Sequence, residues 1–373
     1  MDERACYLGF SLFSGIGPMR FKALFARFGS ARNAWSAPKK DIEETLGTSL
    51  YQKFAGFQKD FYPNEYEQKL EVKKVQFITL ADASYPKSLL QIKNPPIVLY
   101  VKGNTKILKQ VQDDTFRVQN DNDRKIAVVG TRKITEYGRL VTEMFTADLV
   151  AHGFTIVSGL AMGVDGAAHK TAIENNGKTI AVLGCGVDCC TPSENLSLYD
   201  QILEHDGLII SELPLGHSPT KGSFPARNRI VAGLSQAVLV TEGAADSGAL
   251  ITADYAFKFG RKVFAVPGPI TSSLSKGPYV LIQKGAKLVT SAEDIIHELG
   301  IMNKESGKSI KKTKKGDSKE EQKILEALEN EALGFDQLVQ KTGILAQVLG
   351  SMLSIMELKG SIKSTASGGY AAA

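Results

Sequence analysis

Between residues 75 and 299, short runs of aliphatic and β-branched residues alternate with longer stretches of helical character. The runs occupy residues 97–101, 126–129, 155–157, 179–183, 208–210, 237–240, 262–266 and 287–289. Strands that are apolar on both faces and are separated by helices are typical of a parallel sheet covered by helices on both sides. The pattern therefore predicts an α/β fold with a doubly wound, Rossmann-like and mostly parallel sheet.

The N-terminal segment has a different pattern. Residues 1–70 carry apolar residues at three- and four-residue spacing, for example Met19, Leu24, Phe25 and Phe28, which indicates a small helical domain.

A Gly-Ile-Gly-Pro turn in this segment leads into a helix with Arg20, Lys22 and Arg27. A helix-hairpin-helix or SAM-like element presents backbone amides to a phosphate in this way. An ordinary helical packing unit with a solvated basic face explains the pattern equally well.

The C-terminal segment begins with a change in composition. Residues 303–320 are rich in lysine and lack hydrophobic periodicity, so we expect a flexible linker. Residues 321–373 contain three short amphipathic helices and a final segment suited to a small β-wing, which predicts a winged-helix-like domain. The expected domains are therefore residues 1–70, 75–300, 303–320 and 321–373.

Charge and targeting signals place few constraints on function. The net charge of +5 is only mildly basic, which is compatible with a nucleic-acid partner without requiring one. There is no run of about eighteen apolar residues, and the N-terminus MDERACYLGF lacks the basic and apolar segments of a signal peptide. We expect a cytoplasmic protein with no membrane partner.

The first candidate motif is IAVVGTRKITEYG, in which a buried strand runs into Gly130, Thr131 and Arg132. A glycine lets a ligand approach the backbone, Thr131 is suited to cap the following helix, and Arg132 would lie beside the amides of its first turn. These groups predict an anion site. A plain strand-to-helix turn with Arg132 in solvent remains the alternative.

Signatures of bound cofactors and metals are missing. The dinucleotide pattern G-x-G-x-x-G and the P-loop pattern are both absent. In the second motif, SGLAMGVDGAAHKTAI, Asp165 and His169 are four residues apart on a helix, but a third metal ligand is missing, so we expect a hydrogen bond between them. Cys185 and Cys189 also lack a second ligand pair, and the cysteines are expected to be reduced thiols. We expect no cofactor and no metal.

The third motif, TKGSFPARNRIVAGLS, combines Lys221, Phe224, Arg227, Asn228 and Arg229. A cation for the phosphate and an aromatic face for the base are the minimal requirements for binding single-stranded nucleic acid. Because the two arginines are two residues apart, they cannot share a helix face, and we expect one of them to be structural.

The fourth motif, VLVTEGAADSGALITADYA, follows another buried strand. Ser247 and Gly248 open an alanine-rich helix and form a second amide-lined niche at the same edge of the sheet. Simple helix capping by Ser247 is the alternative. The candidate nucleic-acid-binding residues are therefore Gly130, Thr131, Arg132, Lys221, Phe224, Arg227, Asn228, Arg229, Ser247 and Gly248.

Taken together, VVGTR, GLAMGVDGAAH, FPARNRIVAGLS, SGALITA and FAVPG resemble the DNA-processing protein A (DprA/Smf) family in order and spacing. The resemblance implies an extended Rossmann domain that binds single-stranded DNA and forms homodimers. It further implies that the protein protects incoming DNA and loads the RecA recombinase during natural transformation. Motif matching assigns DNA contacts to Arg132, Lys221 and Phe224.

Two other classes of function are alternatives to DNA binding. A nucleotide-processing hydrolase would use carboxylates at a strand edge, and Glu212 and Glu242 follow strands, but other catalytic candidates are few, so we expect no enzymatic activity. A winged-helix transcription regulator would read bases with residues 345–358. That segment offers Gln347 but no arginine or lysine before Lys359, which favours a protein-contact or structural role.

Overall fold

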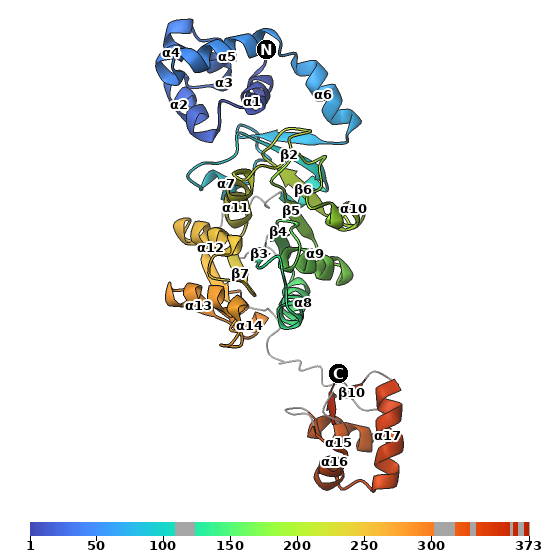
Figure 1. Ribbon diagram of the computed structural model, residues 1–373. Helices are drawn as coiled ribbons and strands as arrows, with labels where there is room; N and C mark the ends of the chain where they lie inside the picture. Colours follow the sequence, from blue (N-terminus) through green and yellow to red (C-terminus); the bar gives the residue numbers. More distant parts are fainter. Residues whose placement is uncertain (109–123, 302–317, 329–332, 359–360, 365–368, 373) are drawn as a thin grey trace. The chain divides into compact units, whose positions relative to one another are not determined.

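The computed structural model describes residues 1–108, 124–301, 318–328, 333–358, 361–364 and 369–372 (Figure 1). The chain separates into two compact units, Met1–Ile301 and Met302–Ala373. Most of the predicted linker, residues 303–317, lies outside the described residues.

A nine-stranded sheet runs through the first unit, with the strand order β1-β2-β6-β5-β4-β3-β7-β8-β9. In this order, the strands β6-β5-β4-β3-β7-β8-β9 all pair in parallel. At one edge of the sheet, β2 pairs antiparallel with β6, and β1 pairs antiparallel with β2. The strands are β1 (Gln76–Thr79), β2 (Val98–Gly103), β3 (Lys125–Val129), β4 (Thr155–Ser158), β5 (Thr179–Val182), β6 (Leu208–Ser211), β7 (Ala237–Val240), β8 (Lys262–Ala265) and β9 (Lys287–Leu288).

This sheet confirms the predicted fold class. Each predicted apolar run overlaps one strand from β2 to β9. Strand β1 is not among the predicted runs, because it is four residues long, begins with a polar residue and is fixed mainly by its antiparallel pairing with β2.

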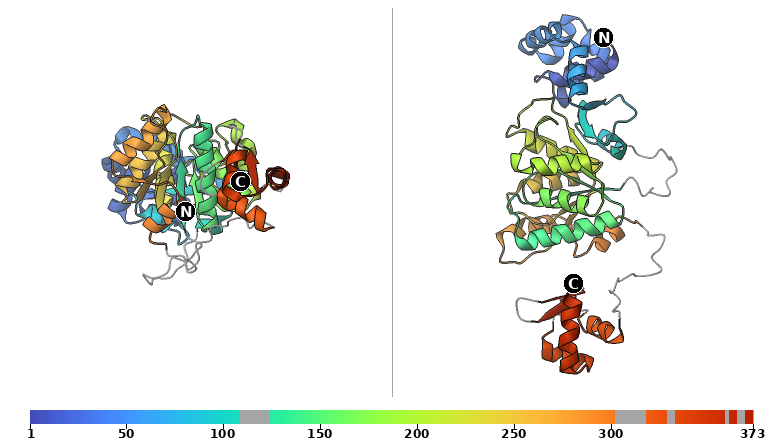
Figure 2. Two further views of the ribbon diagram at one scale, coloured as in Figure 1. Left: turned by 90° about the horizontal axis from the view of Figure 1, so that it is seen from below. Right: turned by 90° about the vertical axis from the view of Figure 1, so that its right-hand side faces the viewer.

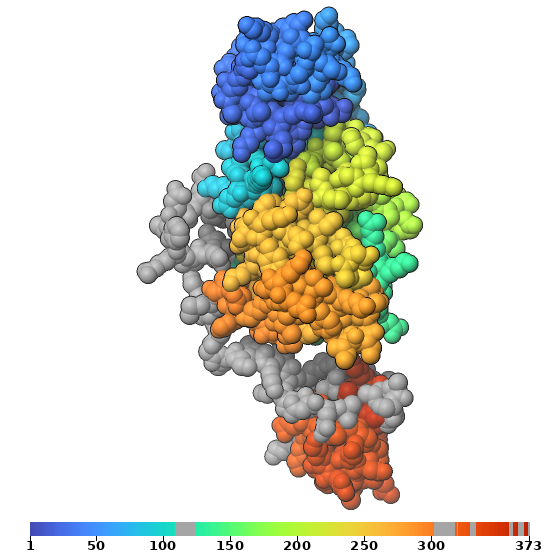
Figure 3. Space-filling view, turned by 60° about the vertical axis from the view of Figure 1, so that its left-hand side comes forward, coloured from blue at the N-terminus to red at the C-terminus, as the bar shows by residue number. Residues whose placement is uncertain are grey.

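Helices cover both faces of the sheet (Figure 1; Figure 2, left). One face carries α8 (Glu136–Ala151), α9 (Val164–Glu174), α10 (Leu196–Glu204) and α14 (Ala292–Glu298). The other carries α7 (Lys87–Leu90), α11 (Ser223–Leu234), α12 (Gly248–Lys258) and α13 (Lys276–Gln283). The adjoining surfaces of α12 and α13 are visible in Figure 3.

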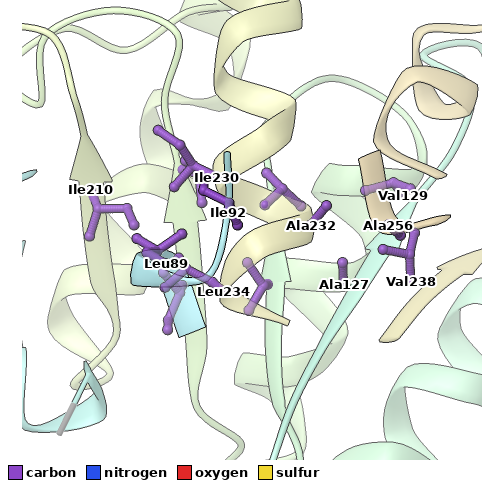
Figure 4. Packing of buried hydrophobic residues seen from close by; sticks show 14 of the residues in the cluster. Leu89, Ile92, Ala127, Val129, Ile210, Ile230, Ala232, Leu234, Val238 and Ala256 are labelled. Atoms are coloured by element: carbon purple, nitrogen blue, oxygen red, sulfur yellow. The ribbon is translucent and has the colours of Figure 1, made fainter. Parts of the chain in front are cut away.

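The strands alternate their side chains between these two layers. In β3, Ala127 belongs to the core under α11 and α12, whereas Ile126 belongs to the core under α8 and α9. Figure 4 shows Ile230 and Leu234 of α11 beside Leu89 in the first of these cores. Because both faces are buried, the strands have no polar alternation, which explains the continuous apolar runs in the sequence.

The first residues form six helices with an aromatic core. Phe10 stacks on Phe54 at 5.4 Å between ring centroids, and the edge of Trp35 meets both rings. The same core includes Tyr100 of β2, which ties these helices to the sheet. The helices are α1 (Glu3–Leu12), α2 (Pro18–Phe28), α3 (Ala31–Trp35), α4 (Lys39–Leu46), α5 (Thr48–Lys59) and α6 (Pro63–Val72).

The basic face of α2 is weaker than its sequence indicates. Arg27 pairs with Asp41 and Glu44, so its charge is largely neutralised within the domain. Met19 is 59% exposed and does not contribute to the core, contrary to the helical pattern read from the sequence.

The second unit is a winged helix with its own core of Ile324, Leu338, Leu349 and Leu353. It consists of α15 (Lys319–Ala327), α16 (Phe335–Thr342), α17 (Ala346–Leu358) and the antiparallel pair β10 (Ile362–Ser364) and β11 (Tyr370–Ala372). Among the described residues, no single helix has the length and apolar composition to cross a membrane. Only Phe335–Thr342 and Ala346–Glu357 together, bent by 111°, meet that criterion.

We predict that removing residues 303–373 leaves a cooperatively folding protein, since Met1–Ile301 forms a compact unit with its own cores. Thermal unfolding followed by circular dichroism checks this, with the full chain as the control. A truncated protein with a broad, non-cooperative transition would show that the sheet domain depends on the C-terminal unit.

Candidate nucleic-acid interface

A cleft of about 340 Å³ opens at the carboxyl ends of β3, β4 and β7. Strands β3 and β7 are neighbours, yet the chain leaves β3 for α8 on one face and β7 for α12 on the other. Open α/β sheets bind ligands at such a switch point. The cleft is lined by Val129, Gly130, Thr131, Arg132, Gly159, Ala161, Asp165, Phe224, Pro225, Arg227, Asn228, Val231, Ala244, Asp246, Ser247, Gly248, Ala249, Ile251 and Thr252.

All of the predicted binding residues except Lys221 and Arg229 line this cleft. Asp246 and Ile251 also line it and were not predicted. Both flank the Ser247-Gly248 motif in the sequence, but nothing in the residue pattern indicates which way they face.

Glu242 holds together the two loops that border the cleft. Its backbone carbonyl accepts a hydrogen bond from the Thr131 amide at 2.8 Å, and its carboxylate accepts from the Thr135 amide at 2.9 Å and the Thr135 hydroxyl at 2.6 Å. A Cβ at Gly138 would lie 2.1 Å from this carboxylate. Glu242 is therefore a buried structural acceptor.

The turn after β3 differs from the prediction at two positions. Thr131 does not cap the next helix: its hydroxyl accepts from the Lys133 amide, and Thr135 is the N-cap of α8. Gly130 is required by packing, since a Cβ there would lie 2.5 Å from Val164 and 2.6 Å from the Glu242 carbonyl. The turn is longer than a direct strand-to-helix connection, so the predicted cap falls in the loop.

Arg227 is a buried cation beneath the cleft, with only 6% of its surface exposed. Its guanidinium donates to the backbone carbonyls of Gly159 and Val182, which lie at the ends of β4 and β5. Burial lowers the pKa of Arg227 and raises the pKa of Asp165, and each charge partly offsets the shift of the other. The carboxylate of Asp165 in turn accepts from the Gly159 amide at 3.1 Å.

Arg229 is also buried, at 8% exposure, and forms an ion pair with Glu212. Burial raises the pKa of Glu212, and Arg229 opposes that shift. The expectation that only one of the two arginines is structural is therefore wrong: both are. Their side chains reach different partners, Arg227 the ends of β4 and β5 and Arg229 the Glu212 carboxylate after β6, and both are buried there.

Arg132 and Phe224 form an exposed pair at the mouth of the cleft. The Arg132 guanidinium is exposed and lies over the Phe224 ring, 5.3 Å from its centroid. Phe224 is partly exposed, so it is not an interior anchor. Lys221 is exposed in the turn before α11, outside the lining of the cleft. The geometry thus presents a cation and an aromatic ring to solvent together.

The middle of α11 is joined to the N-terminus of α12 at the cleft. Ser247 caps α12 by accepting from the Ala249 amide at 3.3 Å, so the capping alternative holds for its side chain. The Asn228 amide donates to the Gly248 carbonyl at 3.2 Å and accepts from Nε of Arg227 at 3.1 Å. Asn228 therefore links the buried cation to the loop that carries Ser247.

Within the described ranges, no group of three or more His, Cys, Asp or Glu residues could hold a metal ion. The cysteines are free thiols.

His169 does not form the expected hydrogen bond with Asp165. Its Nδ1 lies 2.6 Å from the Thr179 hydroxyl, and its Nε2 is buried without a hydrogen-bond partner. Burial, with a smaller effect from Arg227, lowers the pKa of His169 from 6.5 to about 3.

This histidine makes folding stability depend on pH. The folded histidine stays neutral, whereas in the unfolded chain it takes up a proton below about pH 6.5, so acid favours unfolding. We predict that wild type loses about 2 kcal/mol more stability than His169→Leu between pH 7 and pH 5. Urea unfolding at both pH values measures the difference, with the exposed His205→Leu as the control. Equal losses in wild type and His169→Leu would contradict a buried neutral histidine.

Comparison with known proteins identifies the family. The family model of DNA recombination-mediator protein A matches residues 76–300 of this chain, and the family model of the DprA winged helix domain matches residues 311–368. The chain is 40% identical to protein Smf of Synechocystis over 301 residues, which are 80% of this chain and 73% of that protein. It is 42% identical to DNA processing protein DprA of Bacillus subtilis over 225 residues, 60% of this chain and 71% of that protein.

Two solved structures are similar to this one. DNA processing protein A of Streptococcus pneumoniae has a TM-score of 0.66 and 35% identity over 78% of this chain and 95% of that chain. The Helicobacter pylori protein, which has a unique single-stranded DNA binding mode, has a TM-score of 0.51 and 34% identity over 60% of this chain and 95% of that chain. The present chain therefore belongs to the DNA recombination-mediator protein A (DprA/Smf) family.

Proposed function

We propose that this protein binds single-stranded DNA in the cleft at the switch point of its sheet. The observation that carries the proposal is the exposed Arg132–Phe224 pair. A guanidinium neutralises a phosphate, and an aromatic face stacks a base whose edge is not paired. The similarity to the Helicobacter pylori protein, which binds single-stranded DNA, supports this assignment.

The predicted site residues divide into two roles in this proposal. Arg132, Lys221 and Phe224 contact the strand directly, because all three are at least partly exposed. The remaining residues shape the edge of the sheet, since their polar side chains are already bonded within the protein or they have no side chain; they are Gly130, Thr131, Arg227, Asn228, Arg229, Ser247 and Gly248.

We further propose that the protein binds DNA without chemical conversion. The two carboxylates considered for hydrolysis are engaged, Glu212 with Arg229 and Glu242 with Thr135.

As a recombination mediator, a homodimer would protect incoming single strands and load the RecA recombinase on them. The winged helix is less suited to the DNA site, because the described part of α17 has no basic residue and exposes Val348 and Ile355.

The experiment that tests the function compares a single strand with its duplex. The cleft offers a phosphate contact and a stacking face, and no helix aimed at a groove, so we predict tighter binding of the single strand. Fluorescence anisotropy with one labelled strand, alone and annealed, at equal salt measures both affinities. Equal or tighter duplex binding would overturn the proposal.

We predict that Arg132 and Phe224 have different salt signatures. Arg132→Ala or Lys221→Ala should weaken binding and reduce the slope of log K against log salt by about 0.7 for each lost phosphate contact. Phe224→Ala should cost about 1–3 kcal/mol of binding free energy with the slope unchanged, because stacking releases no counterions.

Two controls make this comparison decisive. Lys178→Ala removes an exposed charge directly before β5, at the opposite edge of the sheet, and should leave the slope unchanged. A melting curve for each variant shows whether it is folded. Three folded variants with wild-type binding would remove this edge of the sheet as the DNA site.

A further inference from the structure

One carboxylate of the cleft has no partner among the residues that the structure describes. Asp246 lines the cleft, is exposed, and lies in the loop between β7 and α12. In the part of the chain that the structure describes, its side chain has no hydrogen-bond or ion-pair partner. The other carboxylate of the cleft, Asp165, is buried and bonded to the Gly159 amide.

Two other polar side chains of the α11–α12 side of the cleft are already engaged. Ser247 caps α12, and Asn228 uses its amide group on Gly248 and its oxygen on Arg227. The Asp246 carboxylate, in contrast, is a free acceptor in the cleft. It shares the cleft with apolar surfaces suited to a base, namely the ring of Phe224 and the side chain of Ile251, which is 38% exposed.

An unpaired carboxylate is unfavourable next to a phosphate, because like charges repel. It is favourable next to N–H donors, and the edges of unpaired bases supply such donors in single strands. A cleft that bound only the backbone would gain affinity from losing this charge. The arrangement instead suits a base inside the cleft with its phosphates outside, near Arg132.

We propose that Asp246 selects guanine at one position of the bound strand. Guanine presents two adjacent donors on its Watson–Crick edge, N1–H and the N2 amine, and a carboxylate accepts both in a bidentate pair. Adenine and thymine present one donor group beside an acceptor, and cytosine presents its amine beside an acceptor nitrogen. This inference rests on the proposed single-stranded DNA site and adds base selectivity to it.

The test uses twelve-nucleotide oligothymidylates with one central dG, dA, dC or deoxyinosine. Wild type should bind the dG strand about tenfold more tightly than the all-dT strand. This factor is at the lower end of the range for a bidentate base contact, because Asp246 is exposed. Deoxyinosine lacks the N2 amine and should lose most of that gain. In Asp246→Asn, one of the two acceptors becomes a donor, and dG should bind like dT.

A matched control removes an equal charge elsewhere. Glu204→Gln at the end of α10 lies outside the cleft and should retain the dG preference. A dG preference that survives Asp246→Asn would overturn the inference, as would Asp246→Asn raising the affinity for every strand equally. Wild type that binds all single strands equally would overturn the selectivity alone, whereas failure to prefer single strands over duplex would overturn the proposed function beneath it.

Discussion

The buried guanidinium of Arg227 is the interaction on which the binding edge depends. Two backbone carbonyls at the ends of neighbouring parallel strands, those of Gly159 and Val182, converge on this one cation. No side chain fits between, since a Cβ at Gly159 would lie 1.9 Å from the guanidinium. Removing one partner from a buried charged cluster costs about 3–5 kcal/mol, so this arginine fixes the geometry of β4, β5 and α11 together.

The chemistry of the surface follows from where the charges are placed. Arg227 and Arg229 are buried and form contacts inside the protein, so the motif TKGSFPARNRIVAGLS offers fewer charges to a ligand than its composition indicates. Glu242 joins the loops after β3 and β7 and thereby positions Arg132. The groups left for a ligand are a cation on an aromatic ring at the mouth and a free carboxylate on the rim. A cleft with one exposed charge of each sign is suited to a nucleotide, which has an anionic backbone and a neutral, hydrogen-bonding base.

Much of the fold was predictable because burial on both faces of a parallel sheet leaves continuous apolar runs in the sequence. Strand β1 could not be predicted from apolar runs, because its antiparallel pairing with β2, and not its composition, makes it a strand. The location of the site was predictable for the same reason, since motifs that follow parallel strands must meet at one edge. The burial of individual polar residues could not be predicted. The spacing of Arg227 and Arg229 shows that their side chains diverge, but only the folded structure shows that both are buried. The unsatisfied state of Asp246 likewise depends on contacts that a sequence does not reveal.

Photo-crosslinking shows whether a single strand occupies the cleft beside Phe224. A single-stranded oligonucleotide that carries 5-iodouracil is bound to the full chain and irradiated, and the modified peptides are mapped by mass spectrometry. Binding in the cleft predicts adducts on the peptide that contains Phe224, and their loss in Phe224→Ala. Adducts confined to α17 or to the N-terminal helices, with none at this edge of the sheet, would contradict it.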